Sequence, residues 1–165
     1  MITLVLGGAR SGKSGVAESL AHDSSDPVTY LATGVAGSDA DFARRIAEHR
    51  RRRRATWATL ECGALLTEAL ARVEGTVVVD ALGTWLAAHD DFEVDIEALL
   101  AALASRSGDS IVVSDEVGLG VHPESAVGRA FRDALGLLNQ AVAARADTVL
   151  LVVAGCVVVV KDASR

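Results

Sequence analysis

Residues 7 to 14 read Gly7-Gly8-Ala9-Arg10-Ser11-Gly12-Lys13-Ser14. The stretch fits the pattern G-x-x-x-x-G-K-[ST], in which glycines let the backbone curl until its N–H groups point at phosphate oxygens. An apolar strand, Ile2 to Leu6, precedes it, and Lys13 to His22 follows with helical periodicity. This context favours a phosphate loop over a chance Gly-rich turn. We therefore predict that Lys13 contacts the β- and γ-phosphates of a nucleotide and that the Ser14 hydroxyl ligates Mg²⁺.

Beyond this loop, apolar strands alternate with amphipathic helices. Strands are expected at 28–32, 57–60, 76–79, 110–113, 148–153 and 157–160, and helices at 39–53, 64–73, 94–104 and 126–144. The alternation predicts an α/β fold of the P-loop NTPase (RecA-like) type, with a mostly parallel sheet and helices on both faces. The last two strands are too close in sequence for a crossover, which predicts a C-terminal antiparallel edge hairpin. Residues 1–165 are expected to form a single domain.

Composition bounds the environment. The chain is 50% hydrophobic but only 4% aromatic, so its core is built from Ala, Val and Leu. The cysteines, Cys62 and Cys156, form no C-x-x-C pair, which favours a reducing cytoplasm. The longest apolar run, 148–160, is broken by Ala154-Gly155, so we expect no membrane span.

The charge is unevenly distributed. Net charge is -6, but residues 44–54 hold seven Arg and one Glu. One intense basic patch on an otherwise acidic chain indicates a local anion site better than a surface for long nucleic acid. We therefore expect nucleotides and a small molecule as partners, and no nucleic acid.

Acidic residues follow two of the buried strands. Asp80 ends a run of three valines, where P-loop proteins usually hold Mg²⁺ through water, although Asp80 could instead cap a helix. Asp115 and Glu116 follow the next buried strand. Glu116 could orient a nucleophile or contribute to metal binding. Asp115 could have no more than a structural role, as the cap of a turn that leads to Gly118 and Gly120.

Ligands in such sheets bind beyond the carboxyl ends of the strands. Gly7, Thr33, Asp80 and Glu116 all sit just after predicted strands. We expect them to converge on one crevice.

His49 lies within the arginine cluster. Arg45, His49 and Arg53 are spaced by four and share a helical face. Nearby cations lower an imidazole's pKa and favour its neutral, nucleophilic form, and they would hold a phosphate against it. On these physical grounds alone, however, a solvated basic helix with an incidental histidine is the better interpretation.

Trp57, Thr59 and Glu61 alternate as on a strand. Trp57 could stack on a base and Glu61 could accept hydrogen bonds from a guanine edge or a ribose. A core tryptophan and a surface acid are equally compatible with the pattern.

Taken together, these motifs resemble a known family along nearly the whole chain: the bifunctional adenosylcobinamide kinase / adenosylcobinamide-phosphate guanylyltransferase of cobalamin biosynthesis. The matching segments are GGARSGKS (7–14), RIAEHRRRRRATWATLE (45–61), VVVDALGTWL (77–86), EVGLGVHPE (116–124) and FRDALGLLNQAVAARAD (131–147). The sequence departs from the family pattern at several positions, including Ala88, where the family often has Asn, and the C-terminal VVVVK, where it usually has Pro-Leu. Arg54 replaces Pro, Asp115 replaces the usual Asn, and His122 and Ser125 replace Val and Asn.

The resemblance implies specific roles. His49 would be the histidine that becomes guanylylated, which reverses the interpretation from physics alone. Lys13 and Glu116, singled out above from the loop motif and from position, complete the candidate catalytic set. The nucleotide site would also include Ala32, Thr33, Gly34, Arg50, Arg51, Arg52, Arg53, Glu61 and Asp80, with Ser14 and Asp80 on Mg²⁺. The substrates would be ATP or GTP and a corrinoid, and the family implies a homotrimer.

Two rival functions remain at this point. One is a P-loop kinase that acts on another small alcohol without a covalent intermediate. The other is a nucleic-acid-dependent ATPase that uses the arginine run as its grip. The negative remainder of the chain argues against the second.

Overall fold

The computed structural model describes residues 1–24, 27–34 and 55–163. The predicted helix at 39–53 therefore lies outside the described residues.

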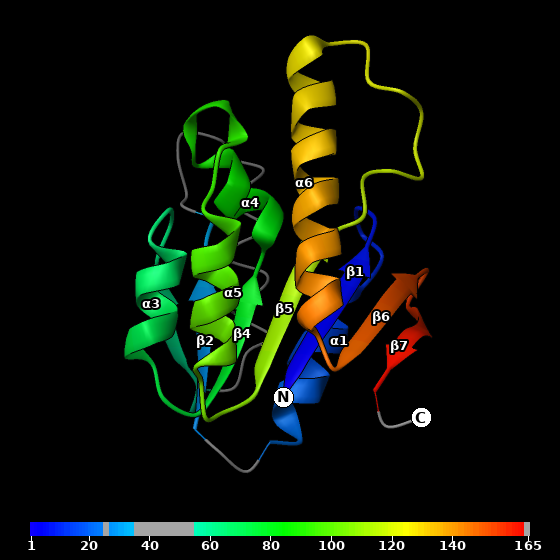
Figure 1. Ribbon diagram of the computed structural model, residues 1–165. Coiled ribbons are helices and arrows are strands. Elements are labelled where there is room, and N and C mark those ends of the chain that lie inside the picture. Colours follow the sequence, from blue (N-terminus) through cyan, green and yellow to red (C-terminus); the bar gives the residue numbers. More distant parts are fainter. Residues whose placement is uncertain (25–26, 35–54, 164–165) are drawn as a thin grey trace.

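A seven-stranded sheet organises the molecule (Figure 1). Its strands are β1 (Ile2–Gly7), β2 (Val28–Ala32), β3 (Ala58–Glu61), β4 (Thr76–Asp80), β5 (Ser110–Asp115), β6 (Thr148–Val153) and β7 (Cys156–Asp162), in the spatial order β3-β2-β4-β5-β1-β6-β7. Neighbouring strands are parallel except for the antiparallel pair β6–β7. The predicted parallel sheet and C-terminal hairpin are thus confirmed.

Helices cover both faces of the sheet. In Figure 1, α3 (Leu66–Arg72), α4 (Leu82–Ala87), α5 (Ile96–Ala104) and α6 (Ala126–Arg145) lie in front and α1 (Lys13–His22) lies behind. A single 3₁₀ turn, Asp90–Phe92, follows α4. The front helices bury leucines such as Leu86, Leu99 and Leu138 against the strands, while α1 buries Ala17 and Ala21. Small side chains on α1 let this helix pack closely against the strands, which brings the phosphate loop near the carboxyl ends of β4 and β5.

The sequence pattern predicts no helix at Leu82–Ala87, where the structure has α4. This six-residue helix is too short to show a period of 3.6 residues. Its first turn is stabilised by the Thr84 hydroxyl, which accepts a hydrogen bond from the Ala81 N–H at 3.3 Å. The helix matters because it begins directly after Asp80.

Candidate active site at the carboxyl ends of the strands

Strand register brings the predicted residues to one edge of the sheet. Gly7 lies opposite Asp115 in the β1–β5 pair. Ala32 lies opposite Asp80 on one side and opposite Glu61 on the other. Residues from five strands therefore lie at the same edge of the sheet, as expected for a ligand site of this sheet type.

The loop backbone has the curled form that the motif predicts. Arg10 and Gly12 have left-handed φ angles of 57° and 96°. The Ser11 N–H donates to the Gly8 carbonyl at 3.2 Å, which closes the turn. Gly7 allows a close approach, because a Cβ there would lie 2.4 Å from Ser11 Oγ. The loop leads directly into α1, whose N-terminus favours a bound anion.

The β6–β7 hairpin braces this loop from the side. Its turn residues, Ala154 and Gly155, have φ angles of 52° and 80°. The Gly155 N–H donates to the Ser11 carbonyl at 2.8 Å. A Cβ on Gly12 would lie 3.5 Å from Gly155 Cα. The hairpin turn and the phosphate loop therefore support each other through backbone atoms.

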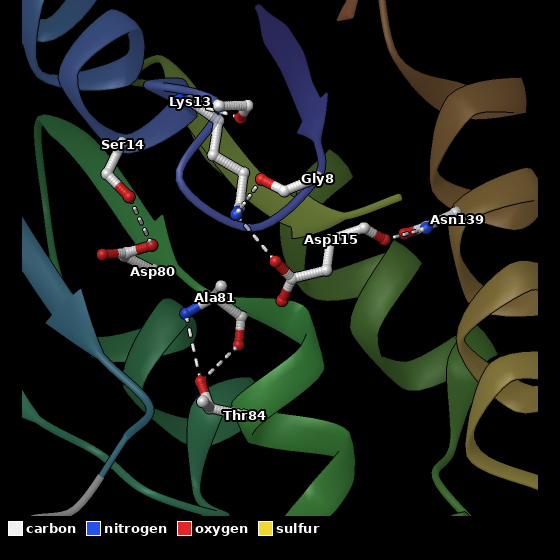
Figure 2. A network of polar contacts seen from close by, with 9 residues as sticks. Gly8, Lys13, Ser14, Asp80, Ala81, Thr84, Asp115 and Asn139 are labelled. Carbon is white, nitrogen blue, oxygen red and sulfur yellow. Dashed lines mark hydrogen bonds and ion pairs between the residues drawn. The ribbon is translucent and has the colours of Figure 1, made fainter. Parts of the chain in front are cut away.

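Lys13 is held in place within the site (Figure 2). Its ammonium donates to the Gly8 carbonyl at 3.2 Å and lies 2.7 Å from Asp115 Oδ1. The Lys13 side chain is only 13% exposed, whereas that of Asp115 is 36% exposed. A carboxylate from β5 thus positions the lysine for which the loop motif predicts phosphate contact.

Ser14, in the first turn of α1, and Asp80, the last residue of β4, are in contact. The Ser14 hydroxyl donates to Asp80 Oδ1 at 3.3 Å, and the Tyr30 hydroxyl donates to Asp80 Oδ2. A hydroxyl beside a carboxylate offers the hard oxygen donors that Mg²⁺ prefers, so the residues fit this metal. Within residues 1–24, 27–34 and 55–163, no group of three or more His, Cys, Asp or Glu could hold a metal ion.

Asp80 is not the N-cap residue of the helix that follows it, so the alternative role considered for it is wrong. The N-cap residue of α4 is Ala81, and its N–H donates to Thr33 Oγ1 at 2.9 Å and to Thr84 Oγ1 at 3.3 Å. Sequence analysis missed Tyr30 as a partner of Asp80. The feature of the sequence that could have revealed this contact is the alternation of side chains along β2, which places Tyr30 on the same face as Ala32.

Thr33 fastens the end of β2 to the start of α4. Its buried hydroxyl donates to the Ala81 carbonyl at 2.7 Å and lies 2.6 Å from Thr84 Oγ1. The Thr33 N–H donates to the Asp80 carbonyl. Since the hydroxyl is engaged in this network, a nucleotide contact from 32–34 would come from the backbone.

Asp115, the last residue of β5, and Glu116, which follows it, have different partners. Glu116, not Asp115, caps the following turn, because its carboxylate accepts from the Gly118 and Leu119 N–H groups at 2.8 and 3.0 Å. Asp115 contacts Lys13 instead. The expectation that Asp115 caps this turn is therefore wrong, and the reason is that Asp115 is the last residue in register with β1.

Trp57, just before β3, and Glu61, the last residue of β3, were considered for base recognition, and β3 is an edge strand of the sheet. Trp57 is half-buried and packs against the core on the α1 side. Glu61 is exposed at the strand end. Next to it, burial raises the pKa of the Cys62 thiol, which donates to the Ala32 carbonyl at 3.5 Å. A neutral thiol is a poor nucleophile, which argues against a covalent role for Cys62.

His49 and Arg50 to Arg53 lie outside the described residues, as does the helical face that they were expected to share. Their roles stay predictions. Among the described residues, no helix is both long and apolar enough to cross a membrane.

Comparison with solved structures agrees with the fold. A prototypical ATPase from the type III secretion system of pathogenic bacteria superposes with a TM-score of 0.58 at 12% identity. The match covers 91% of this chain and 50% of that chain, so this chain spans half of that protein. At this identity the likeness concerns the fold alone.

Sequence comparison is more specific. Residues 3–160 match the family model described as cobinamide kinase / cobinamide phosphate guanyltransferase. The bifunctional adenosylcobalamin biosynthesis protein CobP of Pseudomonas aeruginosa is 45% identical over 164 residues, covering 94% of each chain. The corresponding CobU protein of Salmonella typhimurium is 37% identical over 183 residues, covering 98% of this chain and 100% of the relative. The chain belongs to the cobinamide kinase / cobinamide phosphate guanyltransferase family, a family of bifunctional transferases in adenosylcobalamin biosynthesis.

Proposed function

We propose that this chain phosphorylates adenosylcobinamide and then transfers GMP from GTP to the resulting phosphate through His49. The arrangement of Lys13, Ser14 and Asp80 around the phosphate loop is the observation that supports the first step most strongly. Family membership supports the pairing of the two activities.

In the kinase step, the hydroxyl of the aminopropanol arm attacks the γ-phosphorus of ATP or GTP. The bond to the β–γ bridging oxygen breaks, a nucleoside diphosphate leaves, and the hydroxyl proton is released. Curled backbone N–H groups of Gly8 to Lys13 and the Lys13 ammonium hold the phosphates in line. Ser14 and Asp80 would hold Mg²⁺, which neutralises charge on the β- and γ-oxygens when bound.

In the guanylyl step, an imidazole nitrogen of His49 attacks the α-phosphorus of GTP and pyrophosphate leaves. A phosphate oxygen of the cobinamide phosphate then attacks the same phosphorus, the P–N bond breaks, and free imidazole is restored. Arg50 to Arg53 would neutralise the phosphate as charge develops on it. Splitting the transfer in two means that GTP and a bulky acceptor need not react in one encounter.

Further residues complete the proposed site. Ala32, Thr33 and Gly34 would contact the nucleotide, and Glu61 would accept from it. Glu116 would assist the chemistry, for which its carboxylate must release the Gly118 and Leu119 N–H groups that it now binds.

Turnover tests the whole proposal. The protein incubated with adenosylcobinamide, GTP and Mg²⁺ should yield adenosyl-GDP-cobinamide and pyrophosphate, as measured by mass spectrometry of the corrinoid. Product that stops at the phosphorylated corrinoid would limit the protein to its kinase step. An inert corrinoid together with phosphorylation of another alcohol would instead support the simple kinase.

Asp80→Asn tests the metal site. The amide keeps the shape but binds a hard cation poorly, so the Mg²⁺ concentration for half-maximal kinase activity should rise about 10- to 100-fold. A Mg²⁺ titration of the initial rate measures this. Asp95→Asn is the matched control, because Asp95 caps α5 and Asn caps a helix equally well. An unchanged titration for Asp80→Asn would exclude a metal role for Asp80.

We also propose one domain for residues 1–165, a cytoplasmic location and a homotrimer. Support for a shared site comes from size: a corrinoid is much larger than the nucleotide that the loop holds. Light scattering at working concentration measures the assembly directly, and a fully active monomer would contradict it.

A further inference from the structure

The contact between Lys13 and Asp115 is not explained by phosphate binding. Lys13 Nζ lies 2.7 Å from Asp115 Oδ1, a charge-assisted hydrogen bond of near-optimal length. The ammonium is mostly buried, since the side chain is 13% exposed, so solvent screens the pair only in part. A cation that must contact a triphosphate is therefore already bound to a carboxylate of its own chain.

Asp115 is the fixed member of this pair (Figure 2). Its carbonyl accepts a hydrogen bond from Asn139 Nδ2 at 3.0 Å, which ties the end of β5 to α6. Its other carboxylate oxygen lies against α4, where a Cβ on Gly83 would come within 2.8 Å of Oδ2. Glycine at 83 thus leaves room for the carboxylate, and the helix blocks its movement in that direction.

Lys13 is the member that can move. Its ammonium sits on a four-carbon stem and donates elsewhere only to the Gly8 carbonyl among the contacts of Figure 2. Phosphate oxygens compete with the carboxylate for the same three N–H donors. Every triphosphate that recruits Lys13 must therefore weaken the bond to Asp115 or bring two anions close together.

We infer that Asp115 is a positioning residue that holds the Lys13 ammonium and competes with the triphosphate for it, and so sets the nucleotide affinity of the loop. This inference rests on the proposed use of Gly7 to Ser14 as the triphosphate site. The carboxylate keeps Lys13 directed into the loop and, at the same time, lowers the gain from binding. Tight retention of the nucleoside diphosphate product is thereby avoided.

Asp115→Asn removes the charge and keeps the shape. GTP should then bind about 3- to 10-fold more tightly, the range expected from a partly exposed ion pair strengthened by a hydrogen bond. The turnover number for phosphoryl transfer should fall, because Lys13 is less well held and the diphosphate leaves more slowly. A purely structural defect would weaken GTP binding and slow turnover together. It would not give a lower dissociation constant together with a lower kcat.

A double-mutant cycle with Lys13→Ala separates competition from simple repulsion. Dissociation constants for a fluorescent GTP analogue are measured for the wild type, the two single variants and the double variant, without corrinoid. If Asp115 acts through Lys13, the gain from Asp115→Asn disappears in the Lys13→Ala background. If the gain persists there, the carboxylate only repels phosphate, and the inference is wrong.

Asp109→Asn is the matched control. Asp109 precedes the same strand at its opposite end, about 20 Å away by strand geometry, and pairs with the N-terminal ammonium. It loses the same charge and should leave GTP affinity unchanged. Unchanged or weaker binding by Asp115→Asn overturns the inference. The GTP affinities could change as the double-mutant cycle predicts while the protein turns over no corrinoid. That result would support the inference and reject the proposed function.

Discussion

Protein incubated with GTP labelled at the α-phosphate is expected to retain the label, whereas GTP labelled at the γ-phosphate leaves none. The reason is that attack by His49 on the α-phosphorus keeps GMP on the protein and releases the β- and γ-phosphates as pyrophosphate. The P–N bond should break in acid and survive alkali, as a bond between phosphorus and imidazole does. His49→Ala should lose the label and guanylyl transfer completely.

Controls make this result specific. His49→Ala should retain kinase activity, because that step uses Lys13, Ser14 and the metal but no imidazole nucleophile. His122→Ala, which removes an exposed histidine that contacts Arg132, should still take up α-label. Label that persists in His49→Ala would identify another nucleophile. A wild-type protein that never takes up label would refute the covalent mechanism.

Lys13→Ala should lower kcat/KM of the kinase about 10²–10³-fold, the usual effect of removing one group that stabilises transition-state charge. Binding of triphosphate should weaken as well. The fold should survive, because the change leaves the backbone contacts of the loop, including Ser11 to Gly155, intact. Initial rates and a thermal melt of the variant measure both expectations.

The chain offers one matched lysine for comparison. Lys161 on β7 donates to the Ala143 and Ala144 carbonyls near the end of α6, away from the carboxyl ends of the parallel strands. Lys161→Ala should therefore keep kcat/KM while losing a little stability. Normal turnover by Lys13→Ala would mean that the phosphate loop is not the working site.

Sequence patterns predicted the framework well where one local rule applies. The bounds of α1, β2 and β6 are those expected from periodicity, and Gly7 to Ser14 adopts the curled form that its glycines predict. Short apolar runs such as Val77 to Val79, alternating with amphipathic helices, are typical of a parallel sheet that is covered on both faces, so the fold class follows from this alternation.

The hydrogen-bond and ion-pair partners of the acidic site residues were harder to predict, because they depend on where neighbouring strands end. Nothing local distinguishes Asp115 from Glu116, yet register with β1 directs the first to Lys13 and leaves the second to cap a turn. Tyr30 reaches Asp80 only because β2 and β4 are adjacent. The role of His49 is a prediction from the family pattern, and the labelling experiments described above test it.

The bond between Gly155 and Ser11 has a consequence for the order of synthesis. During synthesis the phosphate loop leaves the ribosome well before the hairpin turn that contacts it. β1 likewise waits for β5 and β6, which flank it in the sheet. A nascent chain therefore carries the complete motif long before it can hold the motif in shape. Nucleotide bound by the completed loop would in turn stabilise the contact between these two segments, which are far apart in sequence, and oppose their separation.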